Sequence, residues 1–418
     1  MTGPQRLDRL ETSRVRLPAA DRDLRGSFMQ LTERFNAKEA QDVDARWVIE
    51  IAAHGQYTIH ISDGRCSVSA GAHPEGDATL TTDVDTWFDL VDGRCDGISA
   101  FACGRLVTGG DLNLALRLGS LFRPGPESSR FIRTTHSDAH GVELESLVVG
   151  RGTPVVLLHG LAASKVSFLP MVDGLADRYE LHALDLPGFG KSDKPLPAGR
   201  RYSMRWMADV VHAYLRSHGL RRAYIVGNSM GGRIAVELAL RHPRRVAGVV
   251  ALCPAVAFDQ WQWLAPALRV LQGHWVGLAP FPVQRATVHA AIADMFYDAS
   301  ALPPGNLSAA ADEFLRGVRD RRHRLAILAC ARHLGAERAS GRRSFWRALE
   351  QLTLPSYWIF GQHDRLVSSR YSERVRDRLP QARCEVWEEV GHVPQFEAPE
   401  LTNERVGAFL DELEAPRS

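Results

Sequence analysis

The sequence has few cysteines and lacks any long apolar segment. Its 6 cysteines are scattered over 418 residues without a C-x-x-C pair, so no dense disulfide framework is predicted. The longest apolar run, Val246 to Phe258, has 13 residues, whereas a membrane-spanning helix needs about 20. Residues 1–25 mix six Arg with four acids and contain no apolar stretch typical of a secretory signal. We therefore expect a cytoplasmic protein with free thiols.

The chain also lacks a large net charge. It has 51 Lys+Arg and 49 Asp+Glu, a net charge of +2, which gives no field of the kind that attracts nucleic acid. With 45% hydrophobic and 24% charged residues it has the composition of a globular protein. The charge is uneven along the chain, however, at −7 for residues 26–122 and +7 for residues 123–418.

Composition and charge together predict two domains. The segment Arg123-Pro124-Gly125-Pro126-Glu127-Ser128-Ser129 has the residues of turns and linkers. We expect a tail over 1–25, a small domain over 26–122, a linker over 123–140 and a larger domain over 141–418.

The small domain is predicted to be mixed α and β. Its expected strands alternate apolar and polar residues, and its expected helices carry apolar residues at helical spacing, including Trp87 and Phe88. The strands are predicted at 47–51, 57–61, 65–70 and 78–81.

The larger domain alternates short apolar runs with helical segments. The runs are predicted as buried strands at 154–158, 181–184, 223–226, 246–252, 356–360 and 384–387. This alternation predicts a doubly wound, mostly parallel sheet, an α/β fold. A helical stretch rich in Trp and Arg, about 256–345, is predicted to be a cap inserted over the carboxyl edge of the sheet.

The strongest motif is Gly227-Asn228-Ser229-Met230-Gly231-Gly232. It is a G-x-S-x-G between a predicted strand and a predicted helix, the setting in which a serine becomes an exposed nucleophile on a sharp turn. Serine alone is a weak nucleophile, so it needs a base and a group that orients the base.

Two further strand ends supply those groups. Asp364 and His392 each follow a predicted strand, and the chain order Ser229, Asp364, His392 is the order expected for this architecture. His363 is the nearest rival for the base, and Asp259 is the rival for the acid. Both alternatives stay open at the level of sequence.

The segment His159-Gly160-Leu161-Ala162 follows the first buried strand. Its Leu161 or Ala162 N–H, with the N–H of Met230, is predicted to face the developing oxyanion. The later Gly190-Lys191-Ser192 matches only the end of a phosphate-binding loop, because Asp185 stands where its first Gly belongs. No cofactor and no metal site is predicted.

These motifs together resemble the α/β-hydrolase superfamily in its esterase, lipase and carbon–carbon bond hydrolase branch. The resemblance covers residues 141–418 and implies a Ser229–His392–Asp364 triad. The carbon–carbon hydrolases usually carry an aromatic residue after the histidine, whereas Val393-Pro394 stands here. That departure favours a carboxylic ester hydrolase, with carbon–carbon bond hydrolysis as the alternative.

Residues 26–122 resemble sterol-carrier-protein-type lipid-binding domains. The closest stretch runs from Phe101 to Leu118 and includes Gly104-Arg105-Leu106 and Gly109-Gly110-Asp111-Leu112. The resemblance implies an apolar ligand, which we expect at the helix of Trp87 and Phe88. A protein that only binds or transfers lipid, with a relic of a hydrolase, is the second alternative.

The start of the cap is apolar and aromatic. Trp261, Trp263 and Leu264 are therefore predicted to line the substrate pocket.

Residues 316–347 hold ten Arg and two acids. This basic segment leaves transient contact with a membrane surface open, beside the simpler interpretation of a solvated helix face. We expect an apolar ester or lipid as the substrate, no nucleic-acid partner, and an oligomeric state that the sequence leaves undetermined.

Overall fold

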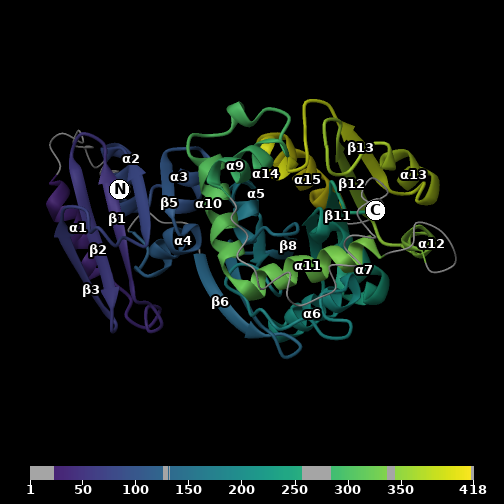
Figure 1. Ribbon diagram of the computed structural model, residues 1–418, viewed down its shortest axis with the longest axis horizontal. Coiled ribbons are helices and arrows are strands. Elements are labelled where there is room, and N and C mark those ends of the chain that lie inside the picture. The colour runs from purple at the N-terminus through teal and green to yellow at the C-terminus, as the bar shows by residue number, and fades with distance from the viewer. Residues whose placement is uncertain (1–22, 126–129, 131, 257–283, 337–343, 416–418) are drawn as a thin grey trace, which may run out of the picture.

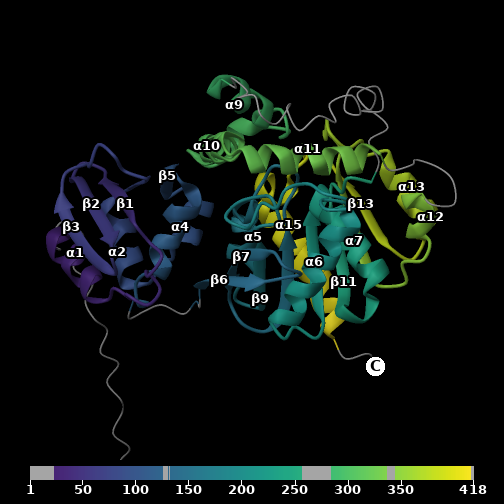
Figure 2. The ribbon, with the colours of Figure 1, turned by 60° about the horizontal axis from the view of Figure 1, so that its bottom comes forward.

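Two separate sheets organise the chain. The computed structural model describes residues 23–125, 130, 132–256, 284–336 and 344–415. A five-stranded sheet has the order β3-β2-β1-β4-β5, and an eight-stranded sheet has the order β13-β12-β11-β10-β8-β9-β7-β6. Figures 1 and 2 show the first sheet in a smaller amino-terminal unit beside the larger unit that contains the second.

The amino-terminal domain packs four helices against its curved sheet. Its strands are β1 (Ala45–Ile51), β2 (Gly55–Ser62), β3 (Arg65–Ala70), β4 (Ala78–Thr82) and β5 (Leu106–Gly110), and its helices are α1 (Leu24–Glu33), α2 (Val84–Asp92), α3 (Gly97–Ala102) and α4 (Leu112–Ser120). The strands β1 and β4 pair in parallel and the other pairs are antiparallel. Asp83, Asp96 and Asp111 cap α2, α3 and α4 by accepting hydrogen bonds from free backbone N–H groups.

The core of this domain is aromatic. The Phe28 ring stacks between the rings of Tyr57 and Trp87, with centroid distances of 4.3 Å to each. The indole N–H of Trp87 donates to Ser27 Oγ at 2.8 Å, so the polar end of the ring is satisfied inside the core.

The larger domain is built on the eight-stranded sheet. Its strands are β6 (Ile132–Asp138), β7 (Glu143–Val149), β8 (Thr153–Leu158), β9 (Tyr179–Leu184), β10 (Ala223–Asn228), β11 (Val246–Leu252), β12 (Ser356–Gly361) and β13 (Arg383–Trp387). Every pair from β13 to β9 is parallel, whereas β7 pairs antiparallel with both β9 and β6. The central strands are buried on both faces, which explains why their sequences are continuous apolar runs.

Helices cover both faces of this sheet and form two core layers. The first layer includes residues of α6 (Met204–Ser217), α7 (Met230–Arg241), α12 (Phe345–Leu349) and α13 (Tyr371–Arg378). The second includes residues of α5 (Leu169–Leu175), α14 (Pro394–Glu397) and α15 (Pro399–Glu414). The described part of the cap contains α9 (Arg285–Ala293), α10 (Asn306–Arg319) and α11 (Arg321–Gly335), which lie above the sheet in Figure 2.

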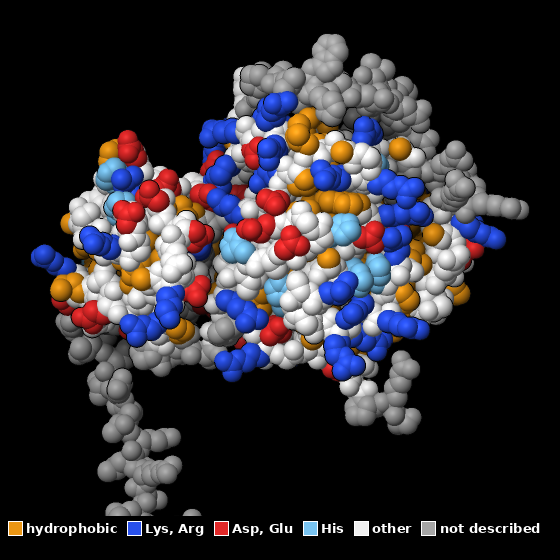
Figure 3. All heavy atoms as spheres, turned by 90° about the horizontal axis from the view of Figure 1, so that it is seen from below, with side chains coloured by type: hydrophobic (Ala, Val, Ile, Leu, Met, Phe, Trp, Pro, Cys, Tyr) orange, Lys and Arg blue, Asp and Glu red, His pale blue; other side chains and the backbone are white. Residues whose placement is uncertain are grey.

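The two domains share a buried interface. Ile98 and Phe101 of α3, and Leu112 of α4, belong to the second core layer of the larger domain. Ser99 Oγ donates to Asp173 Oδ1, and the Arg130 guanidinium bonds both side chains. Figure 3 shows the two lobes in contact, with more basic side chains on the larger lobe in this view.

The predicted fold class is confirmed, with local differences. All of the expected strands are present, and most differ only by one or two residues at their ends. The strands β5, β6 and β7 were not predicted, and β6 lies within the segment 123–140 that the sequence analysis assigned to a linker. An antiparallel edge strand such as β6 is only half buried and lacks a continuous apolar run.

Among the residues that the structure describes, no helix combines the length and the apolar character needed to cross a bilayer.

We expect Phe28→Ala to destabilise the amino-terminal domain by about 3–5 kcal/mol, because it removes the ring between Tyr57 and Trp87. Urea unfolding followed by tryptophan fluorescence measures the change. Met29→Ala is the matched control, since Met29 is the next residue of the same helix and is 63% exposed. Its expected effect is within about 0.5 kcal/mol. An equal loss of stability in both variants would contradict the assigned core.

Candidate active site

Ser229 lies on a strained turn between β10 and α7. Its backbone angles are φ 52° and ψ −115°, a conformation that is costly for a residue with a Cβ and that recurs at functional sites. The neighbouring glycines make the turn possible, because a Cβ on Gly231 would lie 1.9 Å from the Leu158 carbonyl oxygen, and one on Gly227 would lie 2.3 Å from Gly231. The strand β8 and the helix α7 therefore approach as closely as a glycine permits.

Asp364 and His392 form a buried, directly bonded pair. His392 Nδ1 lies 2.7 Å from Asp364 Oδ2. The other carboxylate oxygen, Asp364 Oδ1, accepts the N–H groups of Leu366 and Val367, both at 2.8 Å. These bonds fix the carboxylate, and a proton on Nδ1 leaves Nε2 of the imidazole free to accept one.

The side chain of Asn228, the residue before Ser229, connects the turn of Ser229 to the loop of His392. Asn228 Nδ2 donates to the His392 carbonyl oxygen at 3.0 Å and to the Leu252 carbonyl oxygen at 3.2 Å. The His392 N–H donates in turn to the Met295 carbonyl oxygen. The backbone of His392 is thus joined directly to the residue that precedes Ser229.

The loop after β8 lies against Ser229. A Cβ on Gly160 would be 3.4 Å from Ser229 Cβ. His159 is fully buried, accepts the Leu186 N–H through Nε2 at 3.0 Å and bonds the Gly160 carbonyl oxygen through Nδ1 at 2.7 Å. Burial lowers the pKa of His159 to about 4, which keeps the ring neutral. Because the C=O and N–H of a trans peptide point in opposite directions, holding the Gly160 oxygen also sets the direction of the Leu161 N–H.

The proposed oxyanion donors carry no competing hydrogen bond within the described residues. The N–H groups of Leu161, Ala162 and Met230 have no acceptor among those residues. Met230 is the first residue of α7, so its N–H is among those that a helix leaves without an internal partner.

A buried thiol adjoins the acid–base pair. Cys253 follows β11 directly, and its sulfur, the Asp364 carboxylate and the His392 ring nitrogen lie within 4.8 Å of one another. Burial and the Asp364 charge raise the pKa of the Cys253 thiol, so it stays protonated. The His392–Asp364 hydrogen bond already joins the two facing ligand atoms, an arrangement that suits a triad better than a metal ion. Nothing in the sequence pattern pointed to Cys253.

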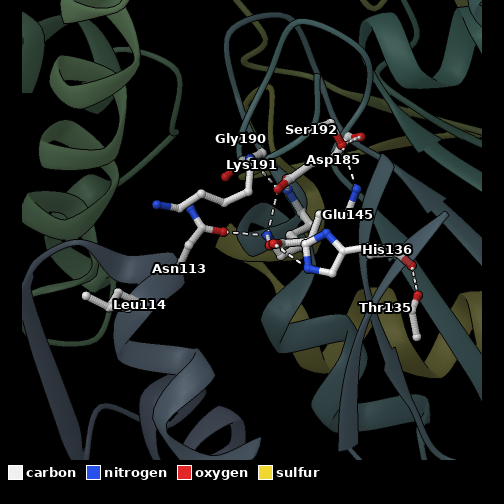
Figure 4. Close-up of polar contacts among 12 residues, drawn as sticks. Asn113, Leu114, Thr135, His136, Glu145, Asp185, Gly190, Lys191 and Ser192 are labelled. Carbon is white, nitrogen blue, oxygen red and sulfur yellow. Dashed lines mark hydrogen bonds and ion pairs between the residues drawn. The ribbon is translucent and has the colours of Figure 1, made fainter. Parts of the chain in front are cut away.

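A second buried group lies where the two domains meet. Lys165 Nζ donates to Asn113 Oδ1, Glu145 Oε1 and Asp185 Oδ2 at 2.6, 2.7 and 2.6 Å. Figure 4 shows Asn113, Glu145 and Asp185 converging from three different segments. The loop of Gly190-Lys191-Ser192 folds around the Asp185 carboxylate, which accepts the Lys191 N–H at 2.9 Å. The loop thus encloses a carboxylate of its own chain.

The structure describes only some of the remaining predicted residues. Trp87 and Phe88 are buried in the amino-terminal core, and His363 is exposed and lies against Tyr297. The predicted pocket residues Trp261, Trp263 and Leu264, and the rival acid Asp259, lie outside the described residues.

Comparison with known proteins identifies both domains. Residues 153–399 match the model of the alpha/beta hydrolase fold family, and residues 28–123 match that of the SCP-2 sterol transfer family. Over 267 residues, 62% of this chain and 96% of the relative, the sequence is 31% identical to a pimeloyl-[acyl-carrier protein] methyl ester esterase of Aeromonas hydrophila.

A second relative and a solved structure are also similar to this chain. Lipase 1 of Psychrobacter immobilis is 27% identical over 64% of this chain and 79% of its own length. The crystal structure of a membrane phospholipase A, a bacterial virulence factor, superimposes with a TM-score of 0.54 at 25% identity, covering 68% of this chain and 87% of that one. The chain therefore belongs to the α/β-hydrolase family, and it carries an SCP-2-type domain at its amino terminus.

Proposed function

We propose that this protein is a serine hydrolase that cleaves carboxylic esters of apolar, lipid-like substrates with Ser229, His392 and Asp364. The observation that carries the proposal is the His392–Asp364 pair at 2.7 Å, joined through Asn228 to the strained turn of Ser229. Relatives that act as a methyl ester esterase and a lipase support ester hydrolysis.

The geometry supports a two-step acyl-enzyme mechanism. Ser229 Oγ attacks the ester carbonyl carbon while His392 Nε2 takes its proton, and Asp364 stabilises the imidazolium. The N–H groups of Met230 and of Leu161 or Ala162 stabilise the negative oxygen of the tetrahedral intermediate. Its collapse releases the alcohol, which receives the proton from His392. Water, deprotonated by His392, then attacks the acyl-enzyme, and the acid leaves as Ser229 regains its proton.

The amino-terminal domain supports an apolar substrate. A domain of SCP-2 type implies binding of an apolar ligand. Val393-Pro394 after the histidine continues to favour an ester over the carbon–carbon bond alternative. Nitrophenyl esters of several chain lengths, assayed beside a dienone-type ring-fission product, separate these two activities.

We expect Ser229→Ala and His392→Ala each to lower ester turnover by about 10⁴-fold or more, with little further loss in the double variant, because the triad acts as a unit. Asp364→Asn is expected to cost about 10⁴-fold, because it favours the wrong imidazole tautomer. Steady-state hydrolysis of a nitrophenyl ester measures each loss.

The rival base His363 and the rival acid Asp259 provide the controls for the triad. His363→Ala and Asp259→Asn should both keep most of the activity. If Asp259→Asn were crippling while Asp364→Asn was mild, the acid would be misassigned. Retention of most activity by Ser229→Ala would contradict the whole mechanism and would favour a protein that only binds lipid.

The apolar start of the cap is proposed to select the acyl chain. If Trp263 lines the pocket, as its sequence context predicts, Trp263→Ala should leave the protein folded and shift its preference among esters of different chain length, because large apolar side chains shape an acyl pocket. A chain-length profile measured beside a thermal melt tests this. Loss of folding with equal loss of activity on every ester would show that Trp263 only packs the cap.

A further inference from the structure

Asn113 offers the hydrolase domain two hydrogen bonds from the neighbouring domain. It is the second residue of α4, and its side-chain oxygen accepts from Lys165 Nζ at 2.6 Å. Its side-chain nitrogen donates to Glu313 Oε1 of the cap helix α10 at 2.7 Å. A carboxamide is uncharged and supplies an acceptor and a donor on two separate atoms, so it can bond an ammonium and a carboxylate at the same time.

Lys165 depends on that acceptor. The side chain is 5% exposed, and its three ammonium hydrogens match three acceptors, Asn113, Glu145 and Asp185. Leaving one hydrogen of a buried ammonium without a partner is costly, so Lys165 shifts when the Asn113 oxygen is removed.

Lys165 in turn holds the loops of the active site. Its backbone N–H donates to Asp185 Oδ1 at 2.8 Å, while its ammonium bonds Asp185 Oδ2. Lys165 directly follows the segment 159–164, which carries Leu161 and Ala162 and lies against Ser229 through Gly160. The path from Asn113 to the proposed oxyanion hole therefore consists of packed and bonded groups without a gap.

The cap is joined to the same point. Glu313 also accepts from Ser164 Oγ at 3.2 Å, and burial raises the pKa of its carboxyl group. On the next turn, Arg316 bridges Glu313 and Asp111, the residue that caps α4. Lys191, from the loop after β9, bonds Asp111 as well, at 2.8 Å. The start of α4 is thus bonded to the loops after β8 and β9 of the hydrolase domain and to the cap.

We infer that Asn113 is a positioning residue for the hydrolase, so that the docked amino-terminal domain completes the support of the oxyanion loop. The inference rests on the proposed mechanism, in which the N–H of Leu161 or Ala162 stabilises the oxyanion. Donors in such a hole act only when they are held in place before the reaction, and misplacement of about 1 Å can slow turnover about 100-fold.

The test uses the full chain and 4-nitrophenyl butyrate, a short ester that does not require lipid delivery. Asn113→Leu, which keeps the number and branching of the side-chain heavy atoms and removes both hydrogen bonds, should lower kcat about tenfold with KM nearly unchanged. Asn113→Asp should also be slow, because it places a second carboxylate against Glu313.

Exchanging the carboxamide of position 113 with the carboxylate of position 313 provides a rescue experiment. Asn113→Asp combined with Glu313→Gln keeps the charge of the cluster, keeps an acceptor for Lys165 at position 113 and returns an amide donor to the pair. This double variant should recover kcat to within about threefold of the wild type. If Asn113→Leu does not fold, the comparison of Asn113→Asp with this double variant still tests the inference, because both proteins have a polar side chain at position 113.

Ser99→Ala is the matched control. Ser99 bonds Asp173 across the same domain interface but does not contact the Lys165 cluster, so this variant should keep the wild-type kcat. An unchanged kcat in Asn113→Leu and Asn113→Asp, or an equal loss in Ser99→Ala, would overturn the inference. A wild-type protein that does not hydrolyse the ester would instead be a failure of the proposed function, visible before any variant is made.

Discussion

The close approach of β8, β10 and α7 at the nucleophile turn is the constraint on which the site depends. Ser229 can adopt φ 52° only because Gly227 and Gly231 let the backbones meet without side chains. A positive φ at a non-glycine residue costs on the order of 1–3 kcal/mol, and the buried strands on either side of the turn supply the packing that holds it. The acid–base pair and the loop after β8 are both arranged around this one turn.

The second organising feature is a set of buried polar groups that join loops from different strands. Asn228 connects the turn to His392, His159 connects the loops after β8 and β9, and Lys165 connects those loops to the amino-terminal domain. Buried polar groups are costly unless they are fully paired, so each of these bonds specifies one arrangement of the loops. On the inference drawn from Asn113, the loops of the hydrolase site are thereby supported by both domains and by the cap.

The sequence predicted the parts of this structure that are governed by local rules. Buried parallel strands are continuous apolar runs, and a serine turn needs small neighbours, so the sequence already placed Ser229, Asp364 and His392 after strands, where the structure has them. The half-buried edge strand β6 and the short β5 lack such runs and were missed. Lys165, Asn113 and Cys253 were missed for another reason, which is that their partners are distant in the chain. Lys165 and Glu313 lie 52 and 200 residues from Asn113, and Gly391 lies 138 residues from Cys253, and no local pattern records such a contact.

The central claim is that Ser229 is an activated nucleophile, and a fluorophosphonate probe tests it most directly. Such a probe reacts with a serine only where a neighbouring base and an oxyanion hole activate it. Peptide mass spectrometry of the labelled, folded protein should find the adduct on Ser229, and the label should be lost in His392→Ala and in heat-unfolded protein. A folded wild-type chain that stays unlabelled, or that is labelled at another serine, would contradict the account.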